Sequence, residues 1–201
     1  MSRWDTLLVV QEHDTAIDQL THRRRGLPER AELEGVMGAL AGVEAEAAEI
    51  EGRKHELVRA QQRLEDEIAT VSAKADLHDK QLYSGSVTNP RDLQAMQDEI
   101  AALKRRVRQL EDQELELMEQ IEPLDADLAK LAARREELDA SAIEIRTRIA
   151  EGEVSVDAEL AVVQAERSTA AAEVDPALLA EYDELRPQLG GIAIARMVGG
   201  H

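Results

Sequence analysis

The sequence contains no cysteine and almost no aromatic residues. Phenylalanine is absent, and Trp4, Tyr83 and Tyr182 are the complete aromatic set. Without cysteine, the chain has neither a disulfide nor a zinc-thiolate site. Because aromatic side chains normally supply much of a globular core, their scarcity argues against an ordinary globular domain.

Long apolar runs and catalytic motifs are also missing. No stretch approaches the roughly 18 apolar residues of a membrane span, and the N-terminus lacks the apolar region of a signal peptide. The sequence has no glycine-rich phosphate loop, no His-Glu-x-x-His and no nucleophile elbow. None of the five histidines are paired at i, i+4 spacing. We expect a cytoplasmic protein without enzymatic activity, small-molecule substrate, membrane contact or metal site of its own.

The residues that are present favour long helices. Alanine, leucine, glutamate and arginine dominate, a third of the chain is charged, and the formal net charge is −18. This composition is typical of coiled coils, and such a negative charge disfavours non-specific binding to nucleic acid. Two short basic clusters are the exceptions, and each is either a phosphate contact or the solvated flank of an acidic helix: Arg23, Arg24 and Arg25, and Lys104, Arg105 and Arg106.

One turn divides the chain into nearly equal arms. Residues 84–90 read Ser-Gly-Ser-Val-Thr-Asn-Pro, which combines turn formers with a proline that cannot continue a preceding helix. Asn89 and Pro90 are typical of a helix N-cap and first position. The sequence therefore predicts an all-α antiparallel two-stranded coiled-coil hairpin over residues 1–175, with arms 2–82 and 91–172 and a tip at 83–90.

Heptads support the hairpin and suggest a register. Apolar residues recur at seam positions from Leu33 to Leu82 and from Leu93 to Ile149, which predicts a left-handed supercoil. If the turn is tight, facing residue numbers sum to about 171. This register sets His78 opposite Leu93 and Val71 opposite Ile100, and it brings Lys54 and Glu114 into adjacent layers, where they would pair.

Several residues disturb this pattern. The Gly26-Leu27-Pro28 segment predicts a kink, Pro123 predicts a bend, and residues 152–157 are a weak point. If Pro28 and Pro123 reversed the chain, the alternative fold would be a compact bundle. Residues 176–201 form a separate C-terminal segment, with a short helix at 177–186 that ends before Pro187 and an extended strand at 192–198.

The predicted tip differs chemically from the arms. A rare aromatic residue stands beside a Ser/Gly turn, and an exposed apolar residue and an arginine follow. Such groups on a rigid stalk suit partner docking, although the loop could equally serve only to close the hairpin. The candidate partner-binding residues are Tyr83, Ser84, Gly85, Val87, Asn89, Pro90 and Arg91.

Residues 82–100, together with the Leu27-Pro28 break and the approach from Tyr182 to Gly200, resemble bacterial coiled-coil proteins that end in a four-cysteine zinc ribbon. The resemblance implies a helical hairpin followed by a ribbon with two CxxC pairs. Some members are linked to RNA binding, to an alternative sigma factor and to flagellar or type III secretion assembly. This sequence has no cysteine, so zinc is expected only where such a ribbon is present, and residues 176–201 would be the lead-in to it.

The favoured function is a non-enzymatic adaptor or scaffold that presents its tip and flanks to protein partners. One alternative is a nucleic-acid-binding regulator that contacts RNA or DNA through the two basic clusters. Another alternative is a purely structural spacer.

Overall fold

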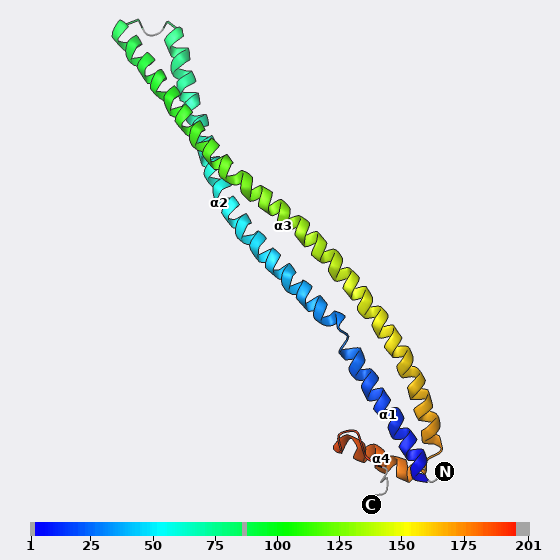
Figure 1. Cartoon of the computed structure of the whole chain (residues 1–201). Helices are drawn as coiled ribbons and strands as arrows, with labels where there is room; N and C mark the ends of the chain where they lie inside the picture. Colours follow the sequence, from blue (N-terminus) through cyan, green and yellow to red (C-terminus); the bar gives the residue numbers. More distant parts are fainter. Residues whose placement is uncertain (1–2, 86–87, 196–201) are drawn as a thin grey trace, which may run out of the picture. The chain divides into compact units, whose positions relative to one another are not determined.

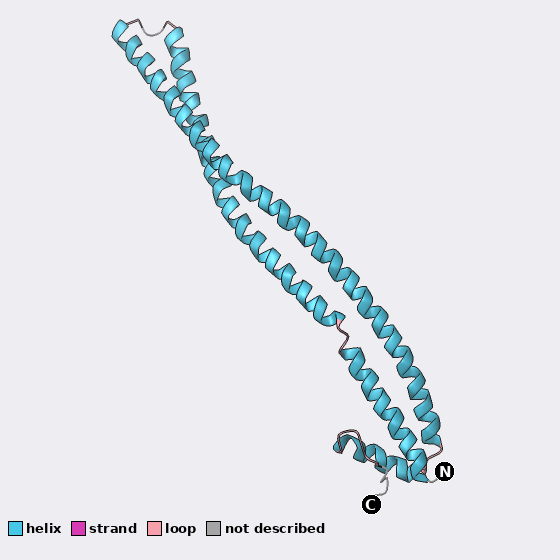
Figure 2. Cartoon of the chain, viewed as in Figure 1, coloured by secondary structure: helices cyan, strands magenta, loops and turns pink. Residues whose placement is uncertain are grey.

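The computed structural model describes residues 3–85 and 88–195, which contain four helices and no strand (Figure 1). Helix α1 spans Arg3–Arg25, α2 spans Glu29–Tyr83, α3 spans Pro90–Ala172 and α4 spans Pro176–Gln188. Only short loops connect them (Figure 2). The predicted all-α fold, with long helices forming a hairpin and a short C-terminal helix, is confirmed. The predicted strand is wrong for Ile192–Ala195, which are irregular, and its remaining residues lie outside the described ranges.

The contacts divide the chain into two compact units. The first unit contains residues 1–38 and 139–201, and the second contains residues 39–138. Residues 176–195 thus belong to the same unit as the N-terminal helix and the end of α3. The predicted boundary near residue 175 stays a prediction.

Burial follows the predicted heptads closely. Each predicted seam position in residues 33–82 and 93–149 is buried or half-buried, with the single exception of Arg135. In the second unit the most buried positions are Leu40, Ala75, Ile100, Leu110, Leu124 and Leu138. Arg135 instead turns outward and pairs with Glu44, with 3.1 Å between Nη2 and Oε1. The seam formed by the two heptad columns of each helix is therefore the core of this unit.

The register differs from the prediction by about one heptad. In the second unit, the residue numbers of the interhelical ion pairs sum to values from 173, for Lys74–Glu99, to 183, for Lys104–Asp79. The midpoint of that range is 178, seven above the predicted 171. Lys54 accordingly pairs with Asp125, and the predicted pair with Glu114 is wrong. A heptad pattern matches itself when it is shifted by seven, so periodicity could not distinguish these two registers.

Neither Pro28 nor Pro123 reverses the chain. Gly26, Leu27 and Pro28 separate α1 from α2, as predicted. Arg24 before this break pairs with Asp157, and Arg30 after it pairs with Glu153, so both helices run antiparallel to α3. Helix α3 continues through Pro123. The compact-bundle alternative is therefore wrong, while the bend at Pro123 stays a prediction.

Residues 152–157, predicted to be a weak point, are helical and make a close contact with the loop between α1 and α2. Gly152 faces the Leu27 side chain, whose Cδ2 would lie 3.3 Å from a Cβ at that position. Glycine therefore lets the loop between α1 and α2 pack directly against α3.

Helix α4 begins at a well-formed cap. The Asp175 carboxylate accepts hydrogen bonds from the amides of Ala177 and Leu178 at 3.1 and 3.2 Å, as expected of an N-cap residue before proline. The helix extends through Pro187 to Gln188, so the predicted end before Pro187 is wrong. Because proline has no amide hydrogen, this last turn lacks the backbone hydrogen bond from residue 187 to the Asp183 carbonyl.

Candidate partner-binding sites

The hairpin tip is highly exposed. Tyr83, the last residue of α2, leaves 81% of its surface accessible. Ser84, Gly85, Asn89, Pro90 and Arg91 are exposed as well. The remaining predicted tip residue, Val87, lies outside the described residues. Because Tyr83 is so accessible, its ring does not serve mainly to cover the last layer of the seam.

Local hydrogen bonds shape both sides of the tip. The Ser84 hydroxyl donates to the Gln81 carbonyl at 2.8 Å, and Gly85 adopts a φ of 74°, a conformation that favours glycine. On the other side, the Asn89 side-chain oxygen accepts from the Arg91 amide at 3.1 Å. Asn89 is therefore the N-cap of α3, as the sequence predicted. These bonds leave the Tyr83 and Arg91 side chains on well-defined helix ends.

The first basic cluster faces acidic residues of α3. Arg23 pairs with Glu159. Arg24 contacts Asp157 at 2.7 Å and Glu153 at 3.4 Å, while Arg25 is exposed. The hydrogen bond to Asp157, together with the charges of Asp157 and Glu153, raises the pKa of Arg24.

The second basic cluster has similar partners on α2. Lys104 lies 3.9 Å from the Asp79 carboxylate, and Arg106 donates to Glu67 at 2.7 Å. Arg105 is exposed. Thus two side chains of each cluster are engaged in ion pairs between helices.

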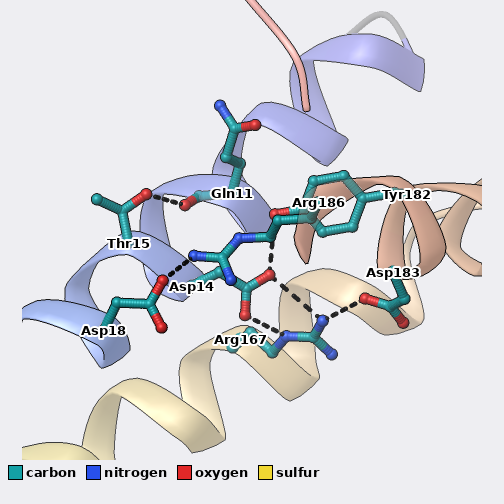
Figure 3. Close-up of polar contacts among 8 residues, drawn as sticks. All are labelled: Gln11, Asp14, Thr15, Asp18, Arg167, Tyr182, Asp183 and Arg186. Atoms are coloured by element: carbon teal, nitrogen blue, oxygen red, sulfur yellow. Dashed lines mark hydrogen bonds and ion pairs between the residues drawn. The ribbon is translucent and has the colours of Figure 1, made fainter. Parts of the chain in front are cut away.

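A cluster in the first unit was not predicted from the sequence. We call it the terminal cluster: its apolar part consists of Leu7, Val10, Val174 and Tyr182, and its polar part of Gln11, Asp14, Asp18, Arg167, Asp183 and Arg186. The polar residues come from α1, α3 and α4 (Figure 3). The apolar residues come from α1, from α4 and from the turn after α3. The cluster fixes α4 against the other two helices.

Asp14 is the centre of the polar part (Figure 3). Its carboxylate accepts from Arg167 Nε at 3.0 Å and Nη2 at 3.3 Å, and from the buried Tyr182 hydroxyl at 2.9 Å. Arg167 also donates to Asp183 at 2.8 Å. Burial, followed by the hydrogen bond to Asp14, raises the pKa of Tyr182 well above its usual range. The hydrogen bond to Asp14 likewise raises the pKa of Arg167.

Gln11 holds the segment that follows α4. Its side-chain oxygen accepts from the amides of Ala193 and Ile194 at 2.7 and 2.8 Å, and its nitrogen donates to the Ile194 carbonyl at 2.7 Å. This residue is only 9% exposed. The segment that Gln11 holds, with Ala193 and Ile194, lines a small pocket of about 100 Å³, whose other lining residues are Trp4, Leu7, Leu178, Glu181, Tyr182 and Leu185.

The sequence carried a signal for this cluster. Gln11 and Asp18 are seven residues apart, as are Leu7 and Asp14, so polar residues occupy heptad positions in α1. Polar residues on a seam require partners. Their partners in α3 and α4 lie more than 150 residues away, however, and the heptad pattern alone does not identify them.

The described residues offer little for other chemistry. In residues 3–85 and 88–195, no group of three or more His, Asp or Glu side chains is arranged to hold a metal ion. Likewise, none of the helices in these ranges is both long and apolar enough to cross a membrane.

Comparisons with known proteins agree with the fold. The chain is similar to a solved structure from Mycobacterium smegmatis, with 24% identity, a TM-score of 0.85, and coverage of 93% of this chain and 77% of the other. The chain is also similar to CT398 from Chlamydia trachomatis, with 20% identity, a TM-score of 0.66, and coverage of 92% of this chain and 77% of CT398. The HP0958 protein from Helicobacter pylori shares 16% identity, with a TM-score of 0.52 and coverage of 94% and 78%.

The family follows from a more direct match. No curated protein matches the chain. Residues 10–190, however, match the family description of the CT398-like coiled coil hairpin domain, and this range runs from within α1 through α2, the tip, α3 and α4. The chain therefore belongs to the family of CT398-like coiled coil hairpin domains.

Proposed function

We propose that this protein is a non-enzymatic adaptor whose hairpin tip binds a protein partner. The observation that supports it best is Tyr83, an aromatic side chain that is 81% exposed in a chain with only three aromatic residues. Tyrosine and arginine are enriched among the residues that dominate binding energy in protein interfaces. Tyr83 and Arg91 stand at the two helix ends that the tip joins.

The proposed role requires no zinc from these residues. The zinc-ribbon family that the sequence resembles uses four cysteines, and this sequence has none. Binding through the tip depends only on groups that the chain itself contains.

The nucleic-acid alternative has weaker support. A phosphate contact requires available cations, but Arg23, Arg24, Lys104 and Arg106 already pair with carboxylates. The net charge of −18 also opposes the approach of a polyanion. Salt-dependent RNA binding by this chain at low ionic strength would favour the alternative.

A comparison of captured proteins tests the proposal. The full chain, the double variant Tyr83→Ala/Arg91→Ala and the control Leu77→Ser would each be used to capture proteins from cells of the source organism. Leu77 is a suitable control because it is a 55% exposed apolar residue of the same helix. We expect at least one protein to bind the wild type and the control with equal affinity. Its affinity for the double variant should be lower by about tenfold or more, because the two substitutions remove interface hot spots.

Unchanged melting temperatures would show that the variants remain folded. If every captured protein bound the double variant as well as the wild type, the tip would not be a binding site, and the structural-spacer alternative would be favoured.

A further inference from the structure

A second surface, on the flank of the second unit, has the form of a helix-binding groove. Helix α3 carries a row of residues spaced alternately by three and four: Leu115, Met118, Glu122, Asp125, Ala129 and Ala132. Residues with this spacing lie on one face of a helix. Leu115 and Met118 are 55% and 50% exposed, which is unusual for large apolar side chains in a coiled coil that already buries its seam.

Helix α2 supplies the opposite wall. One hollow of about 540 Å³ lies between Val43, Ala47 and Ala48 of α2 and Leu128, Ala129 and Ala132 of α3. A neighbouring hollow of about 450 Å³ lies between Gln61 and the Leu115, Met118 and Ile121 side chains. Asp125 borders the second hollow and Ala129 the first, so the row on α3 connects them. We call the combined surface, represented by Ala47, Ala48, Leu115, Met118, Ala129 and Ala132, the flank groove.

The side chains of the flank groove suit a third helix. Alanine on both walls allows another helix to approach to the short end of the usual 8–10 Å interaxial distance. Leu115 and Met118 would then supply apolar contacts at one end, and methionine adapts readily to different partners. Residues 115–132 span about 26 Å of helix, enough for a partner helix of about 18 residues.

The charge of the groove specifies the chemistry of that helix. Residues 109–129 of α3 contain eight acidic residues and no basic residue. Glu119, Glu122 and Asp125 line one hollow, and Glu44 and Glu51 line the other. Lys54 and Arg135 compensate Asp125 and Glu44. The remaining acidic side chains favour a partner whose flanks carry lysine or arginine.

We propose that the flank groove binds a basic amphipathic α-helix of a partner protein. The apolar face of that helix lies against the alanines, Leu115 and Met118, and its basic flanks lie against the acidic rims. A second copy of this chain is a poor occupant because each copy carries a net charge of −18. The inference rests on the proposed adaptor role, and it specifies the chemistry of one partner.

A synthetic peptide provides the direct probe. It would have 21 residues, with alanine and leucine at the a and d positions of three heptads and lysine at the flanking positions. A scrambled peptide of the same composition would have the same charge without an apolar face. Binding of both labelled peptides to the full chain would be followed by fluorescence anisotropy at about 150 mM salt, where long-range attraction is largely screened.

The decisive variant is Leu115→Ser/Met118→Ser, with Leu77→Ser as its matched control. All three residues are half exposed or more, so the substitutions should leave the fold intact, and none of them changes the net charge. We expect the double variant to weaken binding of the amphipathic peptide about tenfold or more. The control variant should change it less than about twofold.

Three outcomes would overturn the inference. Equal binding of the scrambled peptide would show attraction by charge alone, and equal binding to the double variant would place the contact elsewhere. Self-association in analytical ultracentrifugation that disappears in the double variant would make a second copy the occupant. Because Tyr83→Ala/Arg91→Ala should bind the peptide normally, failure at the groove is distinguishable from failure of tip-dependent binding.

Discussion

Asp14 shows how much a single residue contributes to the first unit. Its carboxylate receives a bidentate contact from Arg167 of α3 and a hydrogen bond from Tyr182 of α4. The side chain is mostly buried, so removing its charge would leave Arg167 and the Tyr182 hydroxyl without their main acceptor. Losing partners of buried polar groups is costly. One carboxylate thus helps to hold three helices together.

Because of Tyr182, we expect this cluster to lose stability at alkaline pH. Its pKa is raised in the folded chain by burial and by Asp14, whereas an unfolded tyrosine titrates near about pH 10. The stabilisation is therefore complete below about pH 10 and decreases as the pH rises above it, by at most about 1.4 kcal/mol per pH unit. We expect the melting temperature of the wild type to fall more steeply between about pH 9 and 11 than that of Tyr182→Phe.

The phenylalanine variant should also be less stable at neutral pH, by about 1.5–3 kcal/mol, because it lacks a hydrogen bond to a charged group. Parallel pH profiles for the two proteins, measured by circular dichroism, would contradict the role assigned to Tyr182.

At the scale of helices, the sequence periodicity predicted which residues lie on the seam, but it did not predict the register between the two arms. The positions of the seam residues, the N-cap at Asn89 and the break at Pro28 all follow from local sequence, and the structure has them. The Lys54 pair does not, because registers that differ by seven place the same heptad columns together. The terminal cluster was missed for a related reason: Tyr182 and Asp14 are 168 residues apart, and no periodic pattern joins them.

The glycines of the long helices provide a test at this scale. A Cβ added at Gly52 in α2 would meet no neighbouring side chain within 4 Å, whereas one added at Gly152 in α3 would lie 3.3 Å from Leu27. Alanine is preferred over glycine in helices by about 1 kcal/mol. We therefore expect Gly52→Ala to raise the free energy of unfolding by about 0.5–1 kcal/mol.

Gly152→Val should have the opposite effect, because its larger side chain cannot fit without displacing Leu27. A loss of about 1–3 kcal/mol is typical of such overpacking. Urea denaturation measures both changes, with Gly42→Ala as a second open site. Stabilisation by valine at 152 would show that the loop between α1 and α2 does not pack against this face.

For the whole molecule, the excess of negative charge competes with the interhelical ion pairs. Most of these pairs join partly exposed side chains, such as Lys74 with Glu99 and Arg106 with Glu67. Exposed pairs each contribute about 0–1 kcal/mol, and salt weakens them. Salt also weakens the mutual repulsion of a chain with a net charge of −18. The sign of the salt dependence shows which effect is larger.

We expect repulsion to dominate, so that the melting temperature rises when sodium chloride increases from about 10 to 150 mM. Over this range the screening length falls from about 30 to about 8 Å, which removes repulsion between distant carboxylates before it weakens contacts at about 3 Å. The variant Glu119→Lys/Glu122→Lys reduces the net charge from −18 to −14 at two exposed positions. Its melting temperature should therefore rise less with salt. A melting temperature that falls as salt is added would mean that the ion pairs outweigh the repulsion, and it would make the acidic rims of the flank groove a smaller source of partner affinity than their charge implies.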